Sequence, residues 1–311
     1  MKTIQLIYKM RDKEIVKFKG MLKNIQKKQS GLTVFWTAIF CDKTGQISCK
    51  VWDEQLYQLL KDGGVFEIIG EINDWNGQRS INIKDINKIF EDFSSYMPQV
   101  ENIDKLMNRI LKAISKLDKQ RPYYQITNYL MQKNLFKFEK HPAAKSMHHD
   151  LIGGLVLHTT SMLCVGYRLF EEYSNLGFNL DWDLLASGII LHDLAKIEEI
   201  SFKSGMIDYS LKGQLLGHIV MGVEFIDEAV NALKINDDEA ILLLKHLILS
   251  HHGKEEWGSP KKPMIPEAIL LHHIDLLDSQ MNRCFKMIDT MNEGEIKLDK
   301  DMILYKTKRA T

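Results

Sequence analysis

The stretch LLASGIILHDLAK, residues 184–196, decides the fold of the C-terminal part of this 311-residue chain. Its apolar residues predict a buried helix, and the pair His192-Asp193 interrupts that apolar run. An unpaired carboxylate in such surroundings costs several kcal/mol, so the charge of Asp193 needs a partner. A bound cation supplies that partner directly. The stretch therefore predicts a helical domain built around a metal ion.

Long amphipathic segments surround this stretch and continue from Pro98 towards the end of the chain. Their apolar residues recur at helical spacing. The segments that we expect to be helical are residues 103–117, 123–134, 154–173, 182–194, 215–233, 238–250 and 266–289. We therefore expect this domain to be all-helical.

Potential metal ligands recur along these helices in a definite order. They are His158, the pair His192-Asp193, His218, the pair His251-His252, and Asp275. Imidazole and carboxylate together suit divalent ions such as Mn, Fe, Co or Zn, and a bridging carboxylate can hold two of them. Two such ions, about 3.5–4 Å apart, polarise a phosphodiester and activate water for in-line attack. The set predicts phosphodiesterase chemistry.

A single histidine on an apolar helix more often has a structural role than a ligand role. His246, His272 and His273 fit that description. The interpretation as a metal site rests on the whole set and its order.

The N-terminal part has a different pattern, in which short β-favouring runs alternate with turn signals. The five runs are residues 15–20, 33–41, 46–52, 65–73 and 79–89. Leu56, Leu59 and Leu60, between the third and fourth runs, recur at helical spacing. Five strands with one helix in that position is the order of an OB-fold barrel. We therefore expect an all-β OB-fold barrel at residues 1–93, a linker at 94–100 and an all-α bundle at 101–311.

Aromatic and basic residues are interleaved along the expected strands of the barrel. The residues concerned are Phe35, Trp36, Lys50, Trp52, Trp75 and Arg79. Aromatic rings set in a basic groove stack bases and hold single-stranded nucleic acid without sequence preference. Side chains alternate between the faces of a strand, so about half of these rings belong to the core. Phe35 or Trp36, together with Trp75, are the first candidates for base stacking.

Composition adds constraints on partners and compartment. Residues 1–90 contain 15 Lys and Arg against 10 Asp and Glu, and the remaining residues contain 26 against 31. A basic N-terminal part and an acidic C-terminal part suit a polyanion-binding module joined to a metal-binding module. No apolar run approaches the roughly 18 residues that cross a bilayer, and no secretory leader pattern is present. The four cysteines form no C-x-x-C pair. We therefore expect a cytoplasmic protein without membrane contact.

The order of the helical motifs resembles the HD phosphohydrolase superfamily, and the surrounding sequence is more specific. The blocks HPAAKSMHHDLIGGLVLHT (141–159), LLASGIILHDLAK (184–196), GQLLGHI (213–219), LILSHHGKEEWGSPKKP (247–263) and EAILLHHIDLLDSQM (267–281) look like those of the YhaM family of 3′–5′ exoribonucleases. That family also has the N-terminal barrel, so the resemblance covers nearly the whole chain.

The resemblance implies roles for individual residues. The four ligands of a first metal correspond to His158, His192, Asp193 and Asp275. Asp193 would bridge to a second metal, completed by His218 and by His251 or His252. Lys196 matches the lysine that faces the scissile phosphate in this superfamily, where it would stabilise developing negative charge as a catalytic residue.

Three residues keep two interpretations each. His252 either shares in metal coordination or contacts the phosphate as a catalytic residue. His149 either reaches the substrate and protonates the leaving 3′ oxygen, or it is a capping or surface histidine. Lys145 either contacts a phosphate of the nucleic acid or is an exposed lysine.

The resemblance implies a metal-dependent 3′–5′ exoribonuclease that releases nucleoside 5′-monophosphates from single-stranded RNA, with single-stranded DNA as a second candidate substrate. It implies two divalent ions, with Mn preferred to Co, Fe or Mg. It also implies a homo-oligomer, in which residues 103–117 and 123–134 are candidate contact segments. Two alternatives stay open: an HD-domain hydrolase of a nucleotide or cyclic-nucleotide-type signalling molecule, and a non-catalytic factor that binds single strands.

Overall fold

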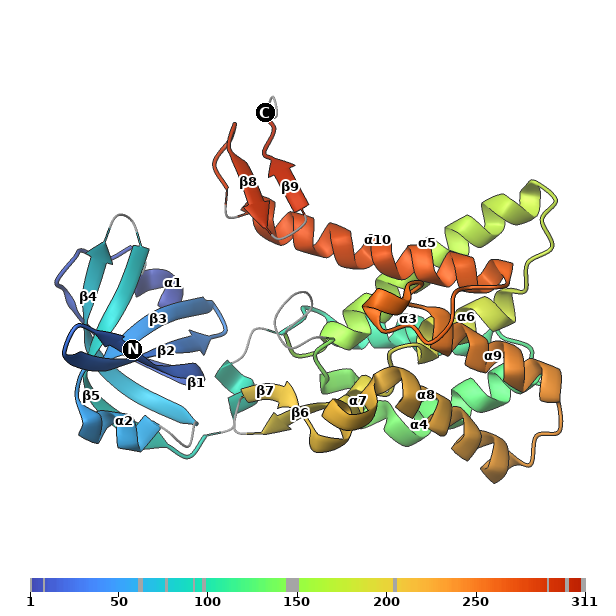
Figure 1. Ribbon diagram of the computed structural model, residues 1–311, viewed down its shortest axis with the longest axis horizontal. Helices are drawn as coiled ribbons and strands as arrows, with labels where there is room; N and C mark the ends of the chain where they lie inside the picture. Colours follow the sequence, from blue (N-terminus) through green and yellow to red (C-terminus); the bar gives the residue numbers. More distant parts are fainter. Residues whose placement is uncertain are drawn as a thin grey trace. The chain divides into compact units, whose positions relative to one another are not determined.

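The structure is a computed structural model, whose elements are labelled in Figure 1. It describes residues 2–308 except 8, 61–63, 76–77, 92, 97–98, 144–150, 204–205, 290 and 300–301. Lys145 and His149 therefore lie outside the described residues, as does the side chain of Trp75. The chain divides into two compact units, which we describe separately. One comprises Met1–Val100 with Ile200–Asp208, and the other comprises Glu101–Glu199 with Tyr209–Thr311.

The first unit contains a closed five-stranded barrel. Its strands are β1 (Ile15–Ser30), β2 (Thr33–Asp42), β3 (Gly45–Val51), β4 (Val65–Trp75) and β5 (Gln78–Ile89), which pair in the order β1-β2-β3-β5-β4. Helix α2 (Glu54–Leu60) lies between β3 and β4 in the chain, α1 (Ile4–Ile7) precedes the barrel, and the 3-10 turn η1 (Phe93–Tyr96) follows it. This order confirms the predicted OB-fold barrel.

Alternation along the strands explains how the barrel encloses its core. In β2, Trp36, Ala38 and Phe40 are buried, while Phe35, Thr37 and Ile39 alternate with them and point to the other face. β3 follows the same pattern, so the two strands present matching inward and outward sets. Apolar side chains from all five strands fill the interior.

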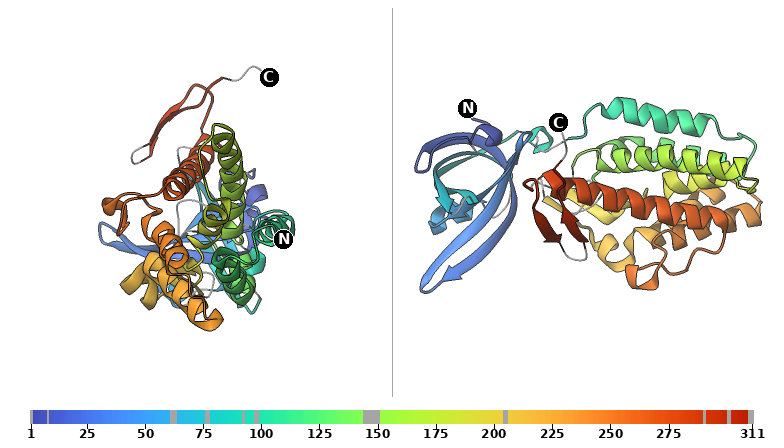
Figure 2. Two further views of the ribbon diagram at one scale, coloured as in Figure 1. Left: turned by 90° about the vertical axis from the view of Figure 1, so that its right-hand side faces the viewer. Right: turned by 90° about the horizontal axis from the view of Figure 1, so that it is seen from above.

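Strand β1 is longer than the sequence predicts. Ile15 to Met21 pair with β4, and Met21 to Ser30 pair with β2. The register shifts between Lys23 and Gln26, where Asn24 has a φ of 49°. Such a bulge bends a strand, so β1 can close the barrel on one side and form a hairpin with β2 on the other. The hairpin is visible in the right-hand view of Figure 2. The prediction that the first run ends at Gly20 is wrong.

The second unit is a helical bundle, as predicted. Its helices are α3 (Ile103–Ser115), α4 (Pro122–Lys140), α5 (Gly154–Asn175), α6 (Trp182–Leu191), α7 (Lys196–Glu199), α8 (Leu211–Leu233), α9 (Asp238–Ser250) and α10 (Pro266–Asp289), with a 3-10 turn η2 at Glu255–Trp257. Helices α3, α5 and α10 run side by side in the right-hand view of Figure 2. Buried apolar side chains from α3 to α10 form one core. Among the described residues, no helix combines the length and apolar composition needed to span a bilayer.

Two β-hairpins interrupt the helical part of the sequence. One is formed by β6 (Ile200–Lys203) and β7 (Met206–Tyr209), the other by β8 (Ile296–Asp299) and β9 (Met302–Tyr305). The expectation of an all-helical domain is therefore wrong at these two places. Each strand has only four residues, which is too short for periodicity to distinguish it from a loop.

Candidate active site

Helix α6 ends at Leu191, three residues before the predicted end, and this early end creates the centre of the site. The amides of Leu194 and Lys196 donate to the carbonyls of Leu191 and Asp193 at 3.1 and 3.0 Å. These three-residue turns are tighter than an α-helix. They direct the Asp193 side chain into the interior, where it is only 3% exposed.

The Asp193 carboxylate faces two groups of side chains with its two oxygens. Oδ2 lies 2.7 Å from Lys196 Nζ, 3.4 Å from His192 Nε2 and 3.6 Å from His158 Nε2. Oδ1 lies 3.4 Å from His218 Nε2 and 3.9 Å from His251 Nε2. One carboxylate thus joins residues from α5, α8 and the ends of α6 and α9. This is the position a bridging ligand requires.

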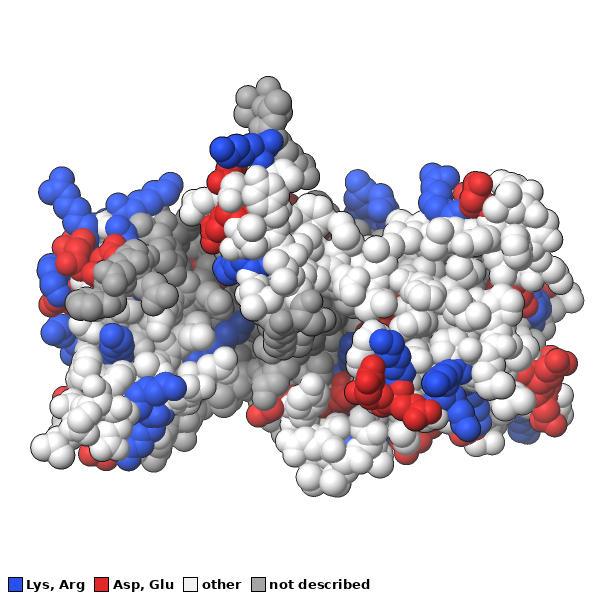
Figure 3. Space-filling view, turned by 45° about the horizontal axis from the view of Figure 1, so that its top comes forward, with Lys and Arg blue, Asp and Glu red and all other residues white. Residues whose placement is uncertain are grey.

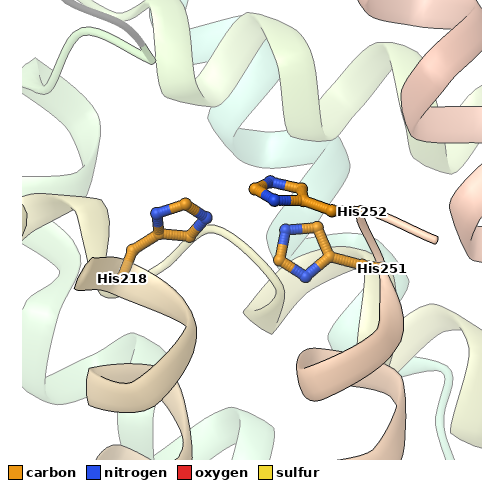
Figure 4. A group of neighbouring side chains, drawn as sticks. All are labelled: His218, His251 and His252. Atoms are coloured by element: carbon orange, nitrogen blue, oxygen red, sulfur yellow. The ribbon is translucent and has the colours of Figure 1, made fainter. Parts of the chain in front are cut away.

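Two groups of potential ligands meet at this carboxylate. His158, His192 and Asp275 form the first, with the His158 Nε2 atom 3.3 Å from both His192 Nε2 and Asp275 Oδ1. His218, His251 and His252 form the second, whose candidate ligand atoms lie within 4.8 Å of one another. Figure 4 shows the three rings of the second group around a common space, between α8 and the end of α9.

Backbone carbonyls set the tautomers of three imidazoles. The Nδ1 atoms of His192, His251 and His252 lie 2.9, 2.7 and 2.8 Å from the carbonyl oxygens of Ile189, Ile248 and Trp257. A carbonyl only accepts, so each neutral ring carries its proton on Nδ1 and keeps a lone pair on Nε2. A lone pair on Nε2 is what metal ligation needs.

Two carboxylates that the sequence analysis missed orient the remaining imidazoles. Asp278 Oδ2 lies 2.7 Å from His158 Nδ1, and both Glu199 carboxylate oxygens lie 3.0 Å from His218 Nδ1. A carboxylate behind a ligating imidazole fixes its orientation and raises its basicity. Asp278 follows Asp275 by three residues on α10, and that helical spacing is the one signal that could have identified it.

A break in α8 brings His218 to Glu199. Gly217 has a φ of 74° and a ψ of 158°, a conformation essentially restricted to glycine. Immediately after it, the His218 amide donates to Glu199 Oε1 at 3.0 Å. Predicting the start of this helix at Leu215 missed both its first turn, capped by Ser210, and this break.

Three buried atoms of the site have unsatisfied hydrogen-bonding capacity. Asp193 Oδ1, His218 Nε2 and His251 Nε2 have no hydrogen-bond partner among the described residues. Buried polar atoms without partners are uncommon because they lose the hydrogen bonds that water would make. Electron-pair donors converging on one place fit a divalent cation, so the residues present suit the metal that an HD domain implies.

The ionisation states also favour cation binding. Burial, together with neighbouring imidazoles, lowers the pKa of His251, so its ring stays neutral. Burial would raise the pKa of Asp193, but Lys196 and His192 outweigh it and hold that pKa well below its usual range. Burial likewise opposes protonation of His158, yet Asp275 and Asp278 raise its pKa to about 10. The region between His158 and the carboxylates therefore stabilises positive charge. A proton on His158 and a bound metal ion would compete for this place.

On the barrel, the candidate stacking residues separate into two faces. Trp36 is 6% exposed and packs within the core against Tyr57, with ring centroids 4.5 Å apart. Its predicted stacking role is not supported, because the ring is covered. Phe35 stacks on Trp52 at 4.6 Å on the outer face, where Trp52 is 48% exposed. This pair is the exposed aromatic platform of the barrel.

Basic and polar residues flank this platform. Lys50, on β3, is paired in register with Asn82 of β5, whose side-chain oxygen accepts from the Trp52 indole at 3.4 Å. Arg79 is bound to Asp74 at 3.0 Å, so its charge is partly neutralised. In Figure 3, Lys and Arg outnumber Asp and Glu on the visible face of the barrel, at the left.

Comparison with known proteins gives two domain families and a set of relatives that match most of the chain. The HD domain family matches residues 155–280, and an OB-fold nucleic acid binding domain family matches residues 16–89. The chain is 37% identical over 276 residues to "3′-5′ exoribonuclease YhaM" of Bacillus pumilus, covering 84% of this chain and 83% of the relative. The proteins with this name from Bacillus subtilis and a Geobacillus species are 35% and 39% identical, with 84% of this chain and 83% and 81% of those relatives covered.

Proposed function

The chain belongs to the YhaM family of 3′–5′ exoribonucleases, and we propose that its helical unit removes nucleoside 5′-monophosphates from the 3′ end of single-stranded RNA, using two divalent cations held around Asp193. The observation that carries this proposal is the Asp193 carboxylate, whose two oxygens face two separate groups of potential ligands. An HD-domain exonuclease with an OB-fold domain acts hydrolytically on nucleic acid, and divalent metal is part of that chemistry.

In this proposal each group of side chains holds one cation. His158, His192 and Asp275 would hold the first, His218 and His251 would hold the second, and Asp193 would be a ligand to both. Bound divalent ions would polarise the phosphodiester and lower the pKa of water. His252, whose ring faces His218 and His251, either joins the second set or contacts the phosphate.

Lys196 has two tasks in the proposed mechanism. Its side chain is 14% exposed and its ammonium nitrogen lies 2.7 Å from Asp193 Oδ2, so it keeps this carboxylate ionised and in place. Burial would lower the pKa of Lys196, but Asp193 outweighs burial and raises that pKa, which keeps the side chain charged. A fixed positive charge next to the reacting phosphate stabilises negative charge in the transition state.

The barrel is proposed to hold the RNA strand away from the site of cleavage. Phe35 and Trp52 would stack on successive bases, and Lys50 would contact the backbone between them. Such stacking tolerates either sugar, so single-stranded DNA is also expected to bind.

We propose residues 94–100, which begin within the 3-10 turn at Phe93–Tyr96, as the connection between domains at 1–93 and 101–311.

The direct test follows 5′-labelled RNA with a 3′ overhang, incubated with Mn²⁺ and the intact protein. We expect products that shorten from the 3′ end, abolished by chelator and by Asp193→Ala. Asp238→Ala, an exposed carboxylate in the first turn of α9, is the matched control and retains activity. Intact RNA with wild-type protein would overturn the proposal and redirect the search to nucleotides and cyclic dinucleotides.

Mn²⁺ is the proposed ion because the sets mix imidazole with carboxylate, whereas Mg²⁺ prefers oxygen ligands in near-octahedral geometry. After chelation, adding back Mn²⁺, Co²⁺, Fe²⁺ or Mg²⁺ separately should restore most activity with Mn²⁺. Restoration by Mg²⁺ alone would contradict this assignment.

A homo-oligomer is proposed from the hairpin β8–β9. Ile296 pairs with Tyr305 and Leu298 with Ile303, so four apolar side chains share one face. They are between 53% and 69% exposed. A two-stranded hairpin is marginally stable alone, and an exposed apolar face of this kind marks an interaction site. We infer that a second copy of the chain covers it, in preference to contacts through α3 and α4, whose apolar faces belong to the core.

Mass measurement in solution tests this inference. We expect an oligomer for the wild type and a smaller species for Leu298→Asp, whereas Lys297→Asp on the opposite face leaves the mass unchanged. A monomeric wild-type protein at micromolar concentration would rule the oligomer out.

The cytoplasm is the proposed compartment. The four cysteines are all free thiols, which suits a reducing environment. Fractionation of cells that produce the protein, with detection by antibody, tests this placement.

A further inference from the structure

A cavity of about 370 Å³ lies in the helical unit between α3 and α5, beside the start of α6. Its lining includes the basic residues Arg109, Lys112, Lys116 and Arg168 and the aromatic residues Tyr167 and Trp182. None of the metal-site residues is among them. We call this cavity the α3–α5 groove.

The α3–α5 groove carries a concentrated positive charge. Arg109 and Lys112 lie on α3 and Lys116 is its C-cap residue. They follow one another by three and four residues, so they project from one face. Within the part of the chain that the structure describes, none of these three has a carboxylate partner. Arg168, the fourth cation, is 3.3 Å from Glu171. The described lining contains no acidic residue, so the groove is complementary to an anion.

A neighbouring cavity provides an internal contrast. It shares Trp182 with the groove, but its other lining residues include Asp118, Asp181, Asp183 and Glu267. The positive character therefore belongs to the groove itself and not to this whole end of the bundle.

The wall formed by α5 and α6 is aromatic and apolar. The Tyr167 and Trp182 rings have centroids 5.1 Å apart at an interplanar angle of 78°, and Tyr167 is 43% exposed. Leu163 and Thr160 continue this wall along α5. Trp182 is partly buried against the core, so Tyr167 is the more accessible ring. Accessible aromatic surface beside a cationic rim is the combination that binds a base and its phosphate together.

We propose that the α3–α5 groove binds a nucleoside 5′-monophosphate. The phosphate would lie on Arg109, Lys112 and Lys116, and the base against Tyr167 and Trp182. The volume lies within the range of about 300–1,000 Å³ typical of small-molecule sites, and it suits a single nucleotide better than a strand. The choice of a 5′-monophosphate rests on the proposed function, since this is the product that the enzyme would release.

The groove is separate from the metal site although both use α5. His158 and Thr160 differ by two positions, so their side chains lie on nearly opposite sides of the helix. A nucleotide in the groove therefore does not occupy the place of the scissile phosphate.

Cys164 supplies a local probe, because its thiol is exposed and lines the groove. We would measure its alkylation by N-ethylmaleimide with peptide mass spectrometry, with and without AMP, and use Cys284 on α10 as the internal reference. At an AMP concentration about ten times the dissociation constant, we expect alkylation of Cys164 to slow about tenfold while Cys284 is unaffected. Adenosine and inorganic phosphate, each lacking half of the ligand, should protect much less.

Substitutions then assign the protection to the groove. Lys112→Ala should raise the AMP concentration that half-protects Cys164 by about tenfold, the effect of losing one charged contact. Lys119→Ala, which removes the same charge from an exposed residue just beyond α3, should leave it unchanged. In an Asp193→Ala background the protection should persist, so failure of the proposed hydrolysis and failure of the groove are distinguishable.

Three results would overturn the inference. These are equal slowing of Cys284, protection that Lys112→Ala leaves intact, or protection by a long RNA oligonucleotide without any by AMP. The last would identify the groove as a strand contact instead.

Discussion

Asp278 holds His158 from behind, so its removal should weaken the site without deleting a ligand. Asp278→Asn keeps the size of the side chain but loses the charge that orients the imidazole through Nδ1. We expect about 10–100-fold lower Mn²⁺ affinity, the range for partners of ligating histidines. Calorimetric titration with Mn²⁺ measures this directly. Asp289→Asn, an exposed position on the same helix, is the control, and equal losses in both variants would refute the role.

The buried thiols of the barrel should make it less stable at alkaline pH. Burial raises the pKa of Cys41 from 9.0 to about 11, and burial also raises the pKa of Cys49. An unfolded thiol ionises near pH 9 while the folded one stays protonated, so stability is complete below pH 9 and falls as pH rises from there. Each cysteine should lower the free energy of unfolding by roughly 1.4 kcal/mol per pH unit in that range.

Denaturant unfolding at pH 8 and pH 10 measures this dependence. Cys41→Ala/Cys49→Ala is expected to be less stable at both values but to lose less between them. An identical decrease in the variant and the wild type would show that other groups are responsible.

Sequence alone predicted most of the individual residues that the structure brings together around Asp193, because their types and order are distinctive. It did not predict Asp278 or Glu199. The spacing of Asp278 from Asp275 was a usable signal, but the place of Glu199 behind His218 depends on how two helices pack. For Phe35 and Trp36, alternation established that the two rings point to opposite faces. Which face is covered depends on closure of the barrel, so the stacking assignment to Trp36 could not be tested before the fold was known.

The break in α8 at Gly217 places His218 by backbone geometry. Gly217→Ala would force a side chain into a conformation that costs about 1–3 kcal/mol. We expect the segment to relax towards regular helix, which moves His218 away from Glu199 and Asp193. Ribonuclease activity should fall more than tenfold, with only a modest decrease in thermal stability. Leu215→Ala, exposed in the preceding turn, is the control. Unchanged activity in Gly217→Ala would show that the break is not needed.

The bounds of the elements were predictable where the pattern is local. Strands β2 to β5 and helices α9 and α10 begin and end within a few residues of their expected limits. The bounds of elements that depend on distant partners were not predictable. Strand β1 continues to Ser30 because it pairs with two strands, and α6 ends early because the turn at Asp193 is stabilised by surrounding helices. Four-residue strands such as β8 carry too little pattern to be recognised.

The two units are expected to divide binding from hydrolysis. Phe35→Ala/Trp52→Ala removes the aromatic platform in the intact chain, and each lost stack is worth about 1–3 kcal/mol. We expect at least tenfold weaker binding of single-stranded RNA, with hydrolysis of a small phosphodiester such as bis(p-nitrophenyl) phosphate unchanged. Fluorescence anisotropy and absorbance measure the two quantities. Trp36→Phe, within the core, should alter stability and not RNA affinity. Loss of small-substrate hydrolysis in the double variant would contradict this division.

Helix α5 connects the metal site and the α3–α5 groove as a single rigid rod. It runs without interruption from Gly154 to Asn175, with His158 on one side and the groove residues on the other. If α5 moves when a ligand binds at one of its sides, the residues on its other side move with it. Such linkage is reciprocal: any factor by which AMP changes the affinity for Mn²⁺ must equal the factor by which Mn²⁺ changes the affinity for AMP. Through this one helix, the enzyme would sense its own product.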